Sequence, residues 1–265
     1  MQHALLGSLL ASIACALIGT YIVTRRLVFI SGGLTHASFG GIGLGLYLGV
    51  SPILSAAVFA VLSAFGIEWL SKRSDVREDS AIAVFWTFGM ALGILFSFLS
   101  PGFAPDLSTY LFGNILTITS LDLSLLAGLV ALLALFFGLF LHPIMHIAFD
   151  REFSLSQGLP VRRMEYLLMA FIALTIVGCL RMVGIVLAIS LLTIPQMTAN
   201  LFARQFVHII WLSMLVGWVS CLGGLAVSYY LNVPSGASII FCSILIYGFC
   251  KIVTIWKSTF NLSHR

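Results

Sequence analysis

The chain alternates between long apolar stretches and short polar connections. An apolar helix of about 20 residues crosses a bilayer core about 30 Å thick. Nine stretches approach that length: 4–24, 27–49, 52–71, 80–99, 119–142, 164–181, 183–203, 208–230 and 236–256. Two of them are ambiguous as full spans, because the first half of 27–49 is rich in glycine and polar residues and 164–203 is nearly continuous. The pattern therefore predicts an all-α, polytopic transmembrane helical bundle with eight or nine spans.

Composition supports this class of protein. Hydrophobic residues make up 60% of the 265 residues and charged residues only 8%, far from the usage of water-soluble chains. We see no polar region large enough for a soluble module, so residues 1–265 are predicted to form one membrane domain. The five cysteines lie in apolar stretches without a Cys-x-x-Cys pair, which favours buried, reduced thiols.

Basic residues orient the predicted bundle. They fall in clusters that are separated from one another by two apolar stretches, and therefore lie on one side of the membrane. The clusters are Arg25 and Arg26; Lys72, Arg73 and Arg77; Arg151, Arg162 and Arg163; Arg204; and Lys251, Lys257 and Arg265. The positive-inside rule makes this side cytoplasmic, with the N-terminus outside and the C-terminus inside. The net charge of +4 then reflects topology and does not indicate nucleic-acid binding.

One compact polar segment, residues 149–161, separates two apolar stretches. Four-residue spacing places three side chains along one side of a short helix: Phe149, Phe153 and Gln157. Three charged residues occupy its other faces: Asp150, Arg151 and Glu152. Gly158 and Pro160 then favour the end of the helix. Such a surface helix can be gripped by a second protein, and the alternative is an ordinary solvated loop.

Motifs of enzymatic chemistry are missing from the sequence. No lysine follows a glycine, so the chain lacks the Gly-x-x-x-x-Gly-Lys loop that binds the phosphates of ATP. It also lacks the His-Glu-x-x-His motif of metalloproteases and the Gly-x-Ser-x-Gly elbow of many hydrolases. Transport powered by another subunit is therefore favoured over catalysis.

The segment 31–45 is the richest in candidate chemistry. On a helix, His36, Gly40 and Gly43 share one side. The opposite side carries two overlapping Gly-x-x-x-Gly units, which suit close helix packing: Gly41, Gly45 and Gly49. An imidazole inside a bilayer is costly and indicates a functional site. The alternative is that His36 forms a hydrogen bond to a neighbouring helix.

Arg181 is the only basic residue of the apolar region outside these clusters. It lies where two apolar stretches meet, either at the outer interface or capping helix carbonyl groups inside the bundle. A structural or gating role is favoured over contact with a cationic substrate, because like charges repel.

Five motifs in order resemble those of one family. They are residues 32–40 around His36, then 110–116, 150–160, 183–195 and 228–236, and together they cover essentially the whole chain. The family is that of the permeases of bacterial ATP-binding-cassette importers for zinc, manganese and iron.

The resemblance implies a homodimeric permease in the bacterial cytoplasmic membrane. Its expected partners are two ATPase subunits and an extracytoplasmic metal-binding protein, with no permanently bound cofactor beyond the transported ion. Asp150, Arg151, Glu152, Phe153, Gln157 and Gly158 would belong to the helix that couples to the ATPase. His36 would correspond to the intramembrane metal ligand of the family. A permease for a metal chelate such as haem or a siderophore is the alternative.

Three positions depart from the family pattern. Many members have aspartate where this chain has Gly32, Asn114 and Asn232. A carboxylate is a strong ligand for hard divalent cations, whereas glycine offers no side chain and asparagine only a neutral carbonyl oxygen. The choice among zinc, manganese and iron therefore stays open at the level of sequence.

Overall fold

The computed structural model describes residues 2–73, 76–100 and 118–262, with the side chains of residues 73, 181–182 and 258–262 left out. Within these ranges the chain forms ten helices and no strand. Their bounds are α1 (Gln2–Thr24), α2 (Val28–Leu48), α3 (Pro52–Arg73), α4 (Glu78–Leu99), α6 (Ser120–Phe149), α7 (Arg151–Ser156), α8 (Val161–Leu191), α9 (Ile194–Ala199), α10 (Phe206–Leu231) and α11 (Ser235–Leu262). The predicted all-α class is confirmed.

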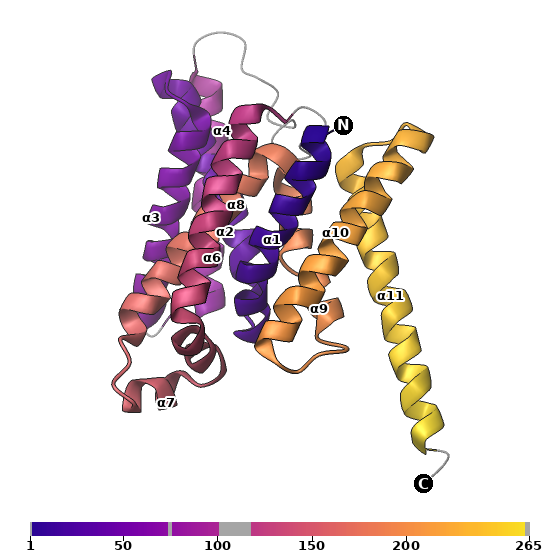
Figure 1. Ribbon diagram of the computed structural model, residues 1–265. Helices are drawn as coiled ribbons and strands as arrows, with labels where there is room; N and C mark the ends of the chain where they lie inside the picture. The colour runs from indigo at the N-terminus through magenta and orange to yellow at the C-terminus, as the bar shows by residue number, and fades with distance from the viewer. Residues whose placement is uncertain (1, 74–75, 101–117, 263–265) are drawn as a thin grey trace.

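The long helices run roughly along one common direction, with their connections at the two ends of the bundle (Figure 1). The short helix α7 and the C-terminus lie at one end, and the N-terminus lies at the opposite end. This is the relative placement that the distribution of basic residues predicts.

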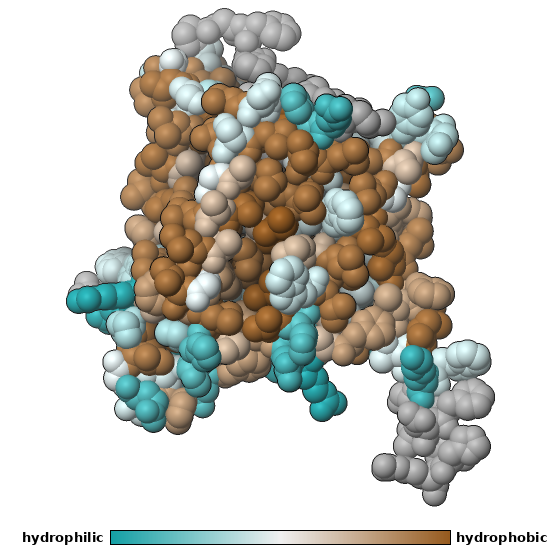
Figure 2. Space-filling view, viewed as in Figure 1, coloured by the Kyte–Doolittle hydropathy of each residue, from teal (hydrophilic) through white to brown (hydrophobic). Residues whose placement is uncertain are grey.

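On the face shown in Figure 2, a broad apolar belt crosses the middle of the molecule, and polar residues gather toward its two ends. Large apolar side chains of the long helices, such as Leu54, Phe88 and Phe241, are more than half exposed. Contiguous apolar surface of this extent is costly in water but suits the hydrocarbon core of a bilayer.

Seven of the described helices are long and apolar enough to cross a membrane: α1, α3, α4, α6, the Val161–Leu180 part of α8, α10 and α11. The predicted eight or nine spans are thus not confirmed. Helix α2 has 21 residues but carries many glycine and polar residues. Residues Val183–Ala199, expected as part of a separate span, form only a shorter apolar segment.

Two long helices are interrupted for different reasons. In α6 the backbone of Phe140 is non-helical, three residues before Pro143, whose ring removes a hydrogen bond and clashes with the preceding turn. In α8 the break is at Gly184, with φ 75° and ψ 172°. This region of backbone space is accessible essentially only to glycine. The predicted stretch 164–181 and the first part of the stretch 183–203 are therefore joined in one broken helix, and the rest of the second stretch contains the separate short helix α9.

Helix α2 lies against neighbours on both of its glycine-bearing sides. On one side, a Cβ atom added to Gly43 would lie 2.4 Å from the carbonyl oxygen of Gly93 in α4. On the other, a Cβ atom at Gly41 would lie 2.5 Å from the carbonyl oxygen of Ser55 in α3, and one at Gly45 would lie 2.8 Å from Cα of Pro52. The surface beside His36, expected to be left bare by glycine, is thus filled by α4.

Gly49 does not have the packing role predicted for it. It follows the last residue of α2 with a left-handed backbone (φ 68°), and its N–H donates to the carbonyl groups of Gly45 and Leu46. A Cβ atom there would meet nothing within 4 Å. The residue therefore ends the helix, as glycine commonly does, and makes no close helix contact.

Candidate functional site

His36 sits midway along α2 and its ring is held by an aromatic neighbour. The imidazole stacks on the Trp86 ring of α4, with ring centroids 4.4 Å apart and planes inclined by 8°. Its Nδ1 atom is buried and has no hydrogen-bond partner. At Nδ1, His36 therefore makes no hydrogen bond to a neighbouring helix, which was the alternative role considered for it, and this nitrogen is a candidate metal-ligand atom.

The hydroxyl groups around His36 do not supply that partner. Ser31 donates to the carbonyl oxygen of Val28 at 2.7 Å, and Ser38 donates to that of Thr35 at 2.6 Å. Thr35 likewise donates to the carbonyl oxygen of Ser31. Each of these hydroxyl groups donates its hydrogen bond to a backbone carbonyl group of α2, so none of them donates to His36.

A complete metal site is not assembled within the described part of the chain. No group of three or more His, Cys, Asp or Glu side chains comes close enough there to hold an ion. Gly32 is buried against Trp86. Asn232 is exposed and ends α10 with a left-handed backbone (φ 52°), which asparagine tolerates better than most residues. Asn114 lies outside the described residues, as does the whole 110–116 motif.

The predicted coupling segment is a six-residue helix, α7, at the end of the bundle that also carries the C-terminus. The Asp150 carboxylate accepts a hydrogen bond from the backbone N–H of Phe153 at 2.9 Å and so caps the helix. The side chains of Phe149, Phe153 and Leu155 are 64%, 49% and 47% exposed. Glu152, Gln157 and Gly158 are also exposed, the last with φ 73°. This segment is therefore an ordered helix with an apolar outer face.

Arg151 points into the protein and belongs to a buried ion cluster. Its Nε lies 2.9 Å from Oε1 of Glu165, a residue of α8 that is only 3% exposed. Arg25 reaches the same oxygen at 3.3 Å, and Lys72 pairs with both Glu165 and Glu68. Buried charges are tolerated only when they are paired, and each carboxylate here has a cationic partner.

This cluster borders a polar cavity of about 220 Å³ between α1, α3, α4, α7 and α8. Three carboxylates and three cationic groups line it: Glu68, Glu78, Glu165, Arg25, Lys72 and Arg151. Sequence reasoning missed the carboxylates of this cluster. The available signal was Glu68 four residues before Lys72, a spacing that pairs side chains on a helix.

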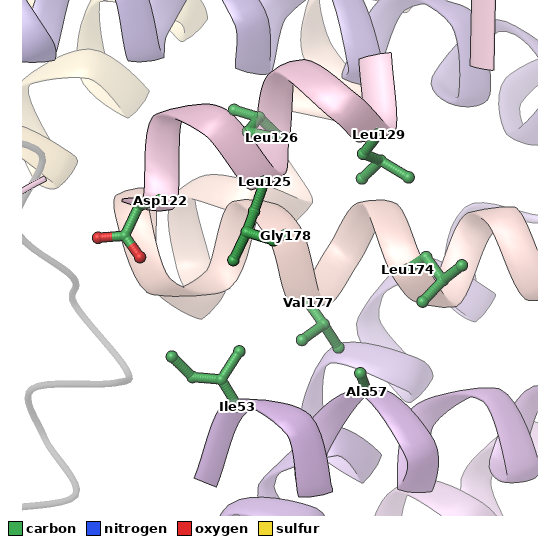
Figure 3. Close-up of a pocket in the computed structure, with 9 residues that line it drawn as sticks. All are labelled: Ile53, Ala57, Asp122, Leu125, Leu126, Leu129, Leu174, Val177 and Gly178. Carbon is green, nitrogen blue, oxygen red and sulfur yellow. The ribbon is translucent and has the colours of Figure 1, made fainter. Parts of the chain in front are cut away.

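A second cavity of about 220 Å³ lies between α3, α6 and α8 and is lined mainly by apolar side chains (Figure 3). Its single carboxylate, Asp122, accepts hydrogen bonds from the N–H and the hydroxyl group of Thr119, which form a capping box at the start of α6. This cavity therefore lacks the donor set of an ion-binding site.

Arg181 lies within α8, three residues before the break at Gly184. Its side chain is outside the described residues, so its predicted gating or structural role stays a prediction.

An apolar helical bundle with a partly buried imidazole inside it and an ordered short helix at one end is the architecture of a polytopic membrane protein. Residues 1–254 match the model of the ABC 3 transport family, and the chain belongs to this family. The family identified from the sequence motifs is thereby confirmed. Its members are membrane permeases of transporters and are not themselves catalytic.

Individual relatives agree over nearly full length. The chain is 40% identical to a membrane protein of Synechocystis sp., over 93% of this chain and 88% of the relative. It is 33% identical to the manganese transport system membrane protein MntC of Halalkalibacterium halodurans, over 91% of this chain and 82% of the relative. Its fold matches a chain of the solved PsaBC complex of Streptococcus pneumoniae with a TM-score of 0.84 and 29% identity, covering 94% and 90% of the two chains.

Proposed function

We propose that the chain is the permease subunit of an ATP-driven importer for a divalent transition metal, with manganese favoured over zinc and iron. The family match and the manganese transport relatives support this cargo. ATP would be hydrolysed by a separate subunit docked on α7, and metal would arrive from an external binding protein. A second copy of the permease would complete the pathway.

His36 is the proposed ligand of this chain for the passing ion. The observation that carries this assignment is the buried, unpartnered Nδ1 atom of a histidine held within the membrane bundle. A neutral imidazole binds first-row transition metals. Burial of such a group without a hydrogen-bond partner costs free energy, and a polar group kept inside the membrane at this cost is a candidate functional residue. Stacking on Trp86 fixes the ring, which lowers the entropy lost when an ion binds.

A sparse ligand set agrees with transport. An ion on a translocation pathway has to leave its site, and water molecules or backbone carbonyl groups can complete its shell. No structural observation favours the alternative cargo, a metal chelate such as haem or a siderophore. Close packing of Gly40 and Gly43 against α4 leaves the face of α2 beside His36 without open space for a large ligand inside this chain.

The test is metal uptake by the complete complex in proteoliposomes, supplied in turn with manganese, zinc and iron. His36→Ala is expected to lower manganese uptake at least about tenfold, because even the loss of a group that only supports a metal ligand costs about 10–100-fold in affinity or activity, while the complex still assembles. His208→Ala is the matched control, because His208 is exposed at the start of α10. Normal uptake of all three ions by His36→Ala would show that the imidazole is a packing residue.

A further inference from the structure

The buried cluster around Glu165 connects parts of the chain that are distant in sequence. Arg151 comes from α7, Glu165 from α8, Lys72 from the end of α3, and Arg25 from the turn after α1. Four elements therefore meet at one carboxylate at the end of the bundle that carries α7. We infer that Glu165 is a positioning residue that ties α7 to α1 and α3, so that movement of α7 is passed to α2.

The first step of this inference concerns the contact with α7. Apart from its own chain connections, α7 makes few contacts with the bundle, and its apolar side chains Phe153 and Leu155 point outward. The Arg151–Glu165 ion pair is the charged link from α7 to the bundle among the described residues. Arg151 therefore acts on the inner side of α7, whereas its exposed apolar residues are the ones available to an ATPase.

The second step concerns the path from Glu165 to His36. Arg25 binds Glu165 and also donates to the carbonyl oxygen of Ile147 in α6 at 3.3 Å. The next residue, Arg26, has φ 59°, and the N–H of Leu27 donates to the carbonyl oxygen of Ile22 at 2.8 Å. These bonds close a tight turn, and α2 begins directly after it at Val28. A displacement of Arg25 is therefore carried by a short, hydrogen-bonded connection into the helix that bears His36.

The third step concerns charge. Glu165 is 3% exposed, and its three cationic partners are each partly exposed. If Arg151 is removed, Arg25 and Lys72 still compensate the carboxylate, so the bundle remains paired while α7 alone is released. Removal of Arg151 therefore tests the link between α7 and the bundle without leaving Glu165 unpaired, so its effect can be distinguished from a loss of folding. The role of Glu165 in coupling rests on the proposed transport function. The link between α7 and Glu165 can be tested without measuring transport.

The decisive variant is Arg151→Gln, with Arg163→Gln as the matched control. Arg163 lies on the same end of the molecule, is exposed and has no ion-pair partner among the described residues. Hydrogen exchange of the purified full-length permease is followed at residues 150–157. We expect exchange there to rise about tenfold in Arg151→Gln and to stay unchanged in Arg163→Gln, since local protection reports local opening. Equal protection of α7 in Arg151→Gln and the wild type would overturn the tie.

The complete complex in proteoliposomes then tests the consequence. Arg151→Gln is expected to move at least about fivefold less manganese per ATP hydrolysed, a typical size for coupling between sites. An unchanged ratio of transport to hydrolysis would overturn the positioning role. Glu165→Gln is the second variant and should change the same ratio. If the wild-type complex itself moves no metal, the proposed cargo fails while the exchange measurement still decides the tie.

Discussion

Gly184 is the residue whose identity the backbone constrains most directly. Its φ of 75° and ψ of 172° break α8 within the membrane bundle. We predict that Gly184→Ala destabilises the permease by about 1–3 kcal/mol, because a Cβ atom is disfavoured in this conformation. The measurement is thermal unfolding of the purified protein in detergent.

The matched control for this substitution is Gly128→Ala in α6. Gly128 has no positive φ, and a Cβ atom there would meet nothing within 4 Å. The control is expected to unfold at or slightly above the temperature of the wild type, because alanine favours the helix. If Gly184→Ala were as stable as this control, the backbone at position 184 would not disfavour a Cβ atom, and the prediction would be wrong.

The sequence placed His36 on the correct helix but did not indicate its surroundings. The periodicity of one helix shows which of its own residues share a face. It does not show that Trp86 stacks on the imidazole or that Glu165 meets Arg25, because these partners lie 50 and 140 residues away along the chain. Side-chain pairing between distant helices depends on tertiary packing, which a single sequence does not report.

Among the elements, α2 and α4 approach each other closely through glycine residues on both helices. Gly43 faces Gly93, and Gly40 faces Gly89. We predict that Gly43→Ala destabilises the protein by about 1–3 kcal/mol, because the new methyl group would meet backbone atoms that cannot rotate away. Thermal unfolding in detergent measures this loss.

Gly248→Ala in α11 provides the comparison for this contact. A Cβ atom at Gly248 meets nothing within 4 Å, so the same chemical change is expected to be tolerated. Equal stability of the Gly43 and Gly248 variants would mean that α2 and α4 separate easily. The sequence signal for the partner helix was Gly89-x-x-x-Gly93, a second unit of the kind identified in α2.

Apolar stretches located most of the long helices, because burial in lipid requires an unbroken apolar run of bilayer length. The pattern did less well where backbone geometry interrupts such a run. Residues 164–203 were predicted to form two spans. In the structure they form the helix α8, which is broken at Gly184, followed by the short helix α9. Gly49 was predicted to be a packing residue, because Gly-x-x-x-Gly spacing does not distinguish the interior of a helix from its end.

At the scale of the whole molecule, we predict that α7 and the connection between α2 and α3 lie on opposite sides of the membrane. Ser156→Cys in α7 and Ser51→Cys before α3 both offer exposed positions. A membrane-impermeant maleimide added to intact cells should label the cysteine at position 51, while that at position 156 should react only in inverted vesicles. Labelling of both from the same side would contradict the topology derived from the basic residues.

Helix α2 lies among α1, α3, α4 and α8, with most of its residues buried. Its glycine and hydroxyl groups suit that protein environment, but they make the helix a poor match for lipid on its own. During synthesis, a segment of low hydropathy partitions weakly from the translocon into the bilayer. We therefore expect integration of α2 to depend on α3 and α4 emerging from the ribosome, so that the first four helices insert into the membrane cooperatively.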